Sequence, residues 1–170
     1  MDTHMAKLAR ALESAVEGMS NEQLRWHPPG KWCATEILEH LYLTYTGTIK
    51  GFERLLASGK PTATSPSTKQ RWRTLVVIGL GYVPTGRKAP SVTEPRGLSS
   101  ETVRTELGTK IAAMDTIIEQ CESRFGRGIP LLDHPILGPL SARQWRKFHL
   151  LHGMHHRKQL LRLRNALENH

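Results

Sequence analysis

Four segments of this sequence repeat apolar residues every three or four positions, which is the spacing of one face of an α-helix. The segments cover residues 5–19, 33–58, 100–125 and 141–168. Residues 59–97 are irregular and rich in Pro, Gly, Ser and Thr. This pattern predicts an all-α four-helix bundle with a long crossover segment between helices two and three. We expect residues 1–170 to form a single domain, because this length suits one hydrophobic core.

Three shorter stretches connect or interrupt these helices. Pro28 and Pro29 remove backbone donors, so the stretch around them cannot be the interior of a helix. Residues 69–82 could form a short helix or a buried strand, and we favour the helix. Residues 126–139 are rich in turn-forming residues and predict a turn-rich connection.

The composition excludes several classes of protein. The chain has 24 Lys and Arg residues against 15 Asp and Glu, a formal charge of +9, which favours an anionic partner. Cys33 and Cys121 form neither a disulfide framework nor a zinc knuckle. No apolar run approaches the ~20 residues of a membrane-spanning helix, and the N-terminus lacks a signal peptide. We therefore expect a cytoplasmic protein that does not bind membranes.

Nucleic-acid binding is the rival function that the charge suggests. Residues 69–73 interleave basic and aromatic side chains, and basic residues are frequent in the last helix. No helix-turn-helix, RNA-binding signature or zinc-finger spacing accompanies them. The sequence therefore disfavours nucleic acid and favours a small-molecule partner. Exposed apolar residues in segment 74–83 would be compatible with a homodimer.

The last helix carries the strongest signal for chemistry. His152 and His156 lie one turn apart, about 40° from each other around the helix axis, on the same stripe as Trp145. Two imidazoles at this spacing can bind one divalent cation. Hydrogen-bonded core histidines and a solvated basic face are the alternatives, and the apolar residues on the stripe argue against the second.

A third ligand has to come from another helix, and His40 is the best candidate. It lies beside the apolar stripe of the second helix, on a face whose other residues are small. Glu36, one turn earlier, could orient His40 or act as a fourth ligand. His149 and His155 lie on opposite edges of the stripe in the last helix, so both cannot join one site.

The sequence resembles the DinB-like (DinB/YfiT) superfamily of bacterial metal-binding four-helix bundles. The resemblance is carried by four stretches of the sequence, which are Trp26–Cys33, Glu36–Leu41, Asp133–Leu140 with Trp145, and His152–Gln159. Each motif is short, but their order and separation together are specific. Cys33 stands where the family usually has a serine that caps helix two, and residues 59–97 match no family motif.

The resemblance implies a metal site formed by His40, His152 and His156. Zinc suits these ligands best, and all-imidazole sites also accept nickel, iron and manganese. Known activities of the superfamily imply a thiol S-transferase that uses a low-molecular-weight thiol, and the positive charge of the chain favours an anionic one. A metal-dependent hydrolase is the alternative, as is a non-catalytic metal-binding module in a stress response. His155 and Glu36 are our candidate catalytic residues, and His149 and Tyr45 are further candidates for a general base.

Overall fold

The computed structural model describes residues 1–84 and 89–168. Its long helices are α1 (Thr3–Val16), α3 (Ala34–Ser58), α5 (Ser100–Phe125) and α6 (Ala142–Glu168). The shorter elements are α2 (Asn21–Arg25), α4 (Thr68–Thr74), the π-helical turn η1 (Leu75–Gly79), the 3-10 turn η2 (Ser91–Thr93) and the strands β1 (Pro130–His134) and β2 (Gly138–Ser141). This architecture confirms the predicted four-helix bundle. None of the helices in the two described ranges is long and apolar enough to cross a membrane.

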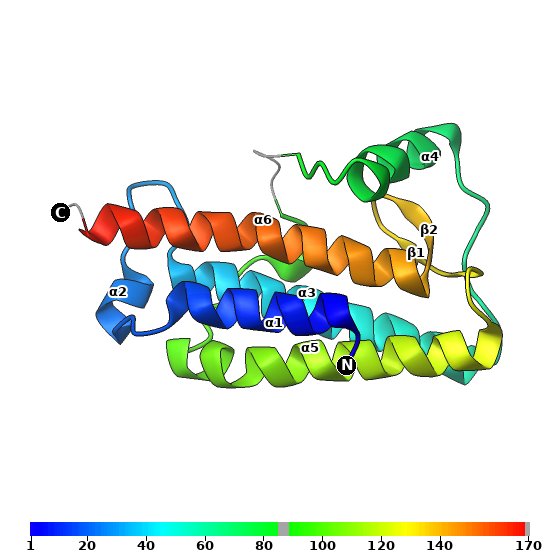
Figure 1. Ribbon diagram of the computed structural model, residues 1–170, viewed down its shortest axis with the longest axis horizontal. Coiled ribbons are helices and arrows are strands. Elements are labelled where there is room, and N and C mark those ends of the chain that lie inside the picture. The colour runs from blue at the N-terminus through cyan, green and yellow to red at the C-terminus, as the bar shows by residue number, and fades with distance from the viewer. Residues whose placement is uncertain (85–88, 169–170) are drawn as a thin grey trace.

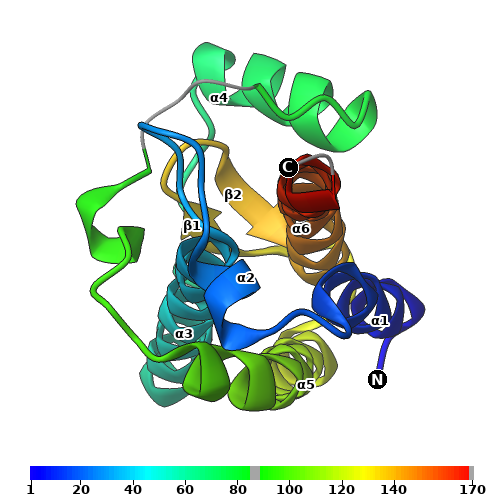
Figure 2. The ribbon, with the colours of Figure 1, turned by 90° about the vertical axis from the view of Figure 1, so that its left-hand side faces the viewer.

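The four long helices lie side by side around one core, with α4 and the hairpin outside them (Figures 1 and 2). The pairs that pack most extensively are α3 with α5 and α1 with α6. Helices α3 and α5 run in the same direction, and α1 and α6 run in the opposite one. Parallel helices cannot be joined by a tight turn, so the chain between α3 and α5 has to return along the bundle.

The start of α3 shows how the sequence sets a helix boundary. Cys33 Sγ accepts the N–H of Glu36 at 3.5 Å, and the Glu36 carboxylate accepts the N–H of Cys33 at 2.8 Å. These reciprocal bonds form a capping box. The same motif begins α2, where Ser20 and Gln23 exchange equivalent bonds.

The crossover contains helical structure, which confirms the helix favoured for residues 69–82. Helix α4 and η1 cover most of this segment, and Val77 and Ile78 pack into the core. The predicted crossover 59–97 also includes residues 85–88, which lie outside the described residues. Large apolar side chains on this segment are exposed, and they are Trp72, Leu75, Leu80 and Tyr82.

The connection before α6 differs from the sequence prediction because it contains a β-hairpin. Strand β1 pairs with β2 in antiparallel register, with Leu132 opposite Leu140 and His134 opposite Gly138. Gly138 has a φ of 77°, a conformation that favours glycine. Strands of five and four residues are too short for an alternating pattern to stand out in the sequence.

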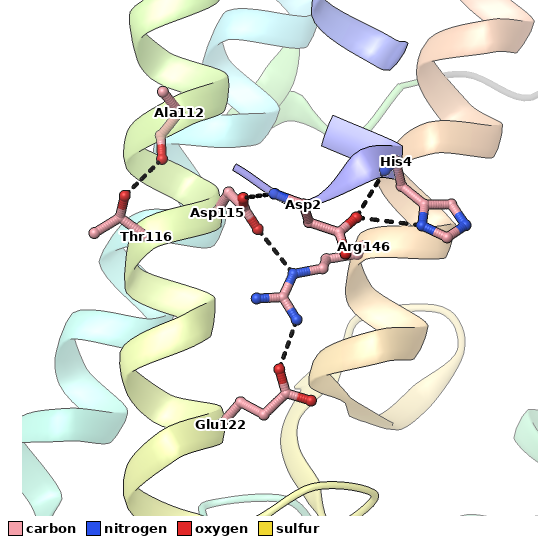
Figure 3. A network of polar contacts seen from close by, with 7 residues as sticks. All are labelled: Asp2, His4, Ala112, Asp115, Thr116, Glu122 and Arg146. Carbon is pink, nitrogen blue, oxygen red and sulfur yellow. Dashed lines mark hydrogen bonds and ion pairs between the residues drawn. The ribbon is translucent and has the colours of Figure 1, made fainter. Parts of the chain in front are cut away.

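A buried ionic network joins α5 and α6 (Figure 3). Arg146 Nε donates to Asp115 Oδ1 at 2.8 Å, and Arg146 Nη1 donates to Glu122 Oε2 at 2.7 Å. The second oxygen of Asp115 accepts the N–H of Asp2 at 2.6 Å, which ties the start of the chain to α5. Burial opposes the charge on Arg146, but the two carboxylates outweigh it and raise its pKa.

Candidate metal centre

Three histidines from two helices meet inside the bundle. His40 comes from α3, and His152 and His156 come from α6. Nε2 of His152 lies 3.1 Å from Nε2 of His156 and 3.5 Å from Nε2 of His40. Each histidine offers one ring nitrogen that lies within 4.8 Å of the nitrogens offered by the other two. The structure thus brings together the three residues that the sequence predicts as metal ligands.

Hydrogen bonds on the far side of two rings decide which nitrogen faces the cluster. His40 Nδ1 lies 2.9 Å from the carbonyl oxygen of Thr93, and His156 Nδ1 lies 2.8 Å from Oε1 of Gln159. Both oxygens only accept, so each Nδ1 carries the proton and each Nε2 keeps its lone pair. This is the tautomer that a metal ligand needs.

The geometry and chemistry of the cluster fit a divalent cation. Zinc–nitrogen bonds of about 2.0–2.1 Å in a tetrahedral site place ligand nitrogens about 3.4 Å apart. The separations of 3.1 and 3.5 Å from His152 are close to this value, and the nitrogens of His40 and His156 lie within 4.8 Å of each other. A single proton on His152 Nε2 can satisfy only one of the two facing lone pairs, whereas one cation satisfies all three nitrogens. Unlike the other two rings, His152 has no hydrogen bond that fixes its tautomer, because its buried Nδ1 has no partner within the described residues.

Burial keeps the three imidazoles neutral. It lowers the pKa of His40, against a smaller opposing effect of the bond to Thr93. Burial also lowers the pKa of His156 to about 3, and the neighbouring His40 adds to the effect. The pKa of His152 is lowered well below its ordinary value by burial and then by the other histidines. Neutral imidazole is the form that binds metal, so at neutral pH the three side chains are in the form that a metal site requires.

A comparison with known families assigns the chain to a family. A family model described as the DinB superfamily matches residues 4–160, which include both helices that supply the cluster. The chain belongs to the DinB superfamily. No curated protein and no solved structure matches it.

Glu36 and His155, the predicted catalytic residues of this DinB-superfamily chain, both lie outside the three-histidine group found in the described part of the chain. The Glu36 carboxylate bonds to the Cys33 N–H in the helix cap, and the metal-binding group found in the described part of the chain does not include it. The His155 ring lies 5.3 Å from the His156 ring. His155 Nε2 is 3.5 Å from Nε2 of Gln159, the residue that also holds His156.

The other two candidates for a general base lie deeper in the bundle. His149 Nε2 is 3.2 Å from Oγ1 of Thr48, and burial lowers the pKa of His149 to about 3. Tyr45 is fully buried, and burial raises its pKa far above the ordinary value. Their rings lie 5.4 Å apart. The structure therefore places both side chains among core residues and outside the three-histidine group.

The groups that orient the rings of His40 and His156 are not predicted from the sequence. Thr93 acts through its backbone carbonyl, so its residue type carries no signal. It lies 53 positions from His40 in the chain, inside a crossover without a recognisable motif. Gln159 does carry a signal, because its position three residues after His156 puts it on the same helix face.

Proposed function

We propose that this DinB-superfamily protein is a metal-dependent thiol S-transferase, with zinc as the metal. Its cluster would hold the ion, and the reaction would join a low-molecular-weight thiol to an electrophilic carbon. The observation that carries the proposal is the convergence of three neutral imidazoles from His40, His152 and His156. Three protein ligands leave a coordination position for a substrate, as catalytic sites do.

The composition of the site favours a thiol over water. A divalent metal, when bound, lowers the pKa of a coordinated thiol so that a thiolate is present at neutral pH. Attack by water usually needs a general base as well. The metal-binding group contains no carboxylate among the residues that the structure describes, and Glu36 is held in the helix cap.

Aromatic side chains form part of the surroundings of the cluster. The Phe148 ring stacks on His152 with centroids 5.4 Å apart and an interplanar angle of 10°. The Trp32 ring lies 5.4 Å from the His40 ring. These rings contact two of the three histidines of the cluster. The excess of basic residues supports an anionic thiol as the incoming substrate.

Hydrolysis is the second candidate, and the position of His155 favours it. This half-buried imidazole lies beside His156, and it could accept a proton from an attacking water. Nearby Lys158 and Arg162 add to burial in lowering the pKa of His155, which keeps its ring neutral. His155→Asn would abolish a hydrolase that uses this base, whereas thiol transfer would survive the change.

The transferase proposal can be tested with a chlorinated dinitrobenzene and a small thiol such as cysteine. The sulfur forms a bond to the aromatic carbon, chloride leaves with the electrons of the C–Cl bond, and the thiol proton passes to solvent. The zinc-loaded protein should accelerate this reaction, and a chelator or His152→Ala should abolish the acceleration. A rate that does not change on chelation would contradict the proposal. Zinc binding without any turnover would favour the non-catalytic alternative.

A further inference from the structure

A buried glutamate next to a predicted metal ligand holds the end of the crossover. Glu39 is only 1% exposed, and it directly precedes His40 in the second turn of α3. Its carboxylate accepts three consecutive backbone N–H groups, from Arg96 at 2.6 Å and from Gly97 and Leu98 at 3.1 Å each. We call this set of contacts the Glu39 latch. It fixes residues 96–98 against α3.

The Glu39 latch is stronger than an ordinary loop contact. Hydrogen bonds to an ionised acceptor are about twice as strong as those between neutral groups. Breaking the latch would leave a buried carboxylate without donors and backbone N–H groups without an acceptor. The full desolvation penalty of these groups would then lower the stability of the fold. Segment 96–98 therefore has one strongly preferred position on the helix.

The same part of the crossover touches the metal centre. The carbonyl of Thr93, three residues before Arg96, accepts the Nδ1–H of His40 at 2.9 Å. Thr93 lies in η2, where its N–H and its hydroxyl both donate to the carbonyl of Pro90, at 2.9 and 3.0 Å. The Arg96 side chain donates to the carbonyl of Val92 at 3.4 Å. These contacts make segment 90–98 one connected unit.

We propose that Glu39 is a positioning residue of the metal centre. By holding residues 96–98, it places the Thr93 carbonyl where it sets the orientation and tautomer of His40. The glutamate touches neither metal nor substrate, and it acts through the crossover. This inference rests on the proposed metal binding by the histidine cluster. Loss of comparable outer hydrogen bonds at metal sites lowers affinity about 10- to 100-fold.

The chain contains a matched control for this role. Asp133 in β1 also uses its carboxylate to hold the crossover, because it accepts the N–H of Thr64 at 3.0 Å and its hydroxyl at 2.6 Å. This contact lies at the other end of the crossover. Asp133→Asn therefore loosens the crossover near Thr64 without disturbing the contact between Thr93 and His40.

The experiment measures the dissociation constant for Zn²⁺ by competition with a chromophoric chelator, using full-length protein without an affinity tag. Glu39→Gln keeps the size of the side chain, but its amide group donates where the latch needs an acceptor. We expect this change to weaken zinc binding at least about 10-fold, and Asp133→Asn to leave it unchanged. Amide hydrogen exchange at residues 96–98 of the metal-free protein should quicken in Glu39→Gln alone.

A second variant changes the backbone that donates to Glu39 instead of Glu39 itself. It tests the role of the Glu39 latch in zinc binding if Glu39→Gln does not fold. Gly97 has a φ of 93°, and an added Cβ would meet nothing within 4 Å. Gly97→Ala thus strains the backbone of the latch without a clash, and zinc binding should weaken in the same direction.

The outcomes separate this inference from the function on which it rests. If the wild type binds zinc and both folded variants bind it equally well, the role of Glu39 is wrong while metal binding stands. Equal weakening in Asp133→Asn would also overturn the role, since any loosening of the crossover would then suffice. A wild type that binds no zinc removes the proposed function and this inference with it.

Discussion

Helix α6 carries two buried polar clusters that are built in opposite ways. Around Arg146, each guanidinium contact meets a carboxylate, so donors and acceptors are matched within the protein. Around His152, three neutral bases face one another, and the lone pairs outnumber the available protons. The first arrangement is complete by itself and joins two helices. The second costs stability unless a cation binds, which is the expected pattern for a functional site.

The largest expected effect is a loss of stability without a loss of zinc binding when the ionic network around Arg146 is broken. Arg146→Met would leave the buried Asp115 and the half-buried Glu122 without their counter-charge, which should lower the free energy of unfolding by about 3–5 kcal/mol. Zinc affinity should not change, because Arg146 lies outside the histidine cluster. Urea unfolding and a zinc titration measure the two quantities, with the exposed Arg143→Met as control. Loss of zinc binding in a folded Arg146 variant would contradict this division.

Metal addition should stabilise the protein through the second cluster alone. Zinc at 100 times its dissociation constant should raise the free energy of unfolding by about 2.7 kcal/mol. His152→Ala should show no such gain, and a chelator should reverse it in the wild type. Thermal or urea unfolding with and without zinc provides the measurement. A similar gain in His152→Ala would mean that zinc binds elsewhere on the chain.

Acid should destabilise the folded protein through the imidazole of His134 in β1. His134 accepts the N–H groups of Ile136 and Leu137 through Nδ1, and burial lowers its pKa to about 4. The unfolded chain binds this proton near pH 6.5, so the stabilising contribution of neutral His134 is complete above pH 6.5 and is lost as the pH falls towards 4. We expect a loss of about 1–3 kcal/mol from this residue.

His134→Asn isolates this contribution. Its side-chain oxygen can accept the same kind of backbone N–H but does not titrate in this range. Unfolding measured by circular dichroism at pH 7 and pH 4.5 should show a smaller loss in the variant than in the wild type. Equal losses in both proteins would show that His134 does not contribute to acid sensitivity.

The smallest expected effect concerns the start of α3, the helix that brings His40 to the cluster. Cys33 caps this helix through a weak sulfur acceptor, and burial raises the pKa of its thiol. Cys33→Ser should stabilise the protein by about 0.5–1 kcal/mol, because a hydroxyl is a better cap. Zinc binding and thiol transfer should not change. Loss of transfer in a stabler variant would instead assign a reactive role to Cys33.

The sequence predicts the parts of this molecule that depend on local pattern. The four long helices follow from periodicity, and the meeting of His40 with the pair in α6 is predicted jointly by the i,i+4 spacing and the family resemblance. The β1–β2 hairpin is missed because its strands are short. The ionic network around Arg146 depends on long-range packing, which no local spacing shows. The contact between the Thr93 carbonyl and His40 cannot be predicted for a further reason, because every residue has a backbone carbonyl.

The central claim is that the cluster of His40, His152 and His156 holds a divalent metal. The most direct test is equilibrium dialysis of the tag-free protein against zinc, followed by metal analysis. We predict one zinc ion per chain in the wild type. The control variant His134→Ala should bind the same amount, because the half-buried imidazole that it removes lies near Phe148 but outside the cluster. His152→Ala should retain none. Equal zinc in His152→Ala and the wild type, or no zinc in either, would contradict the account.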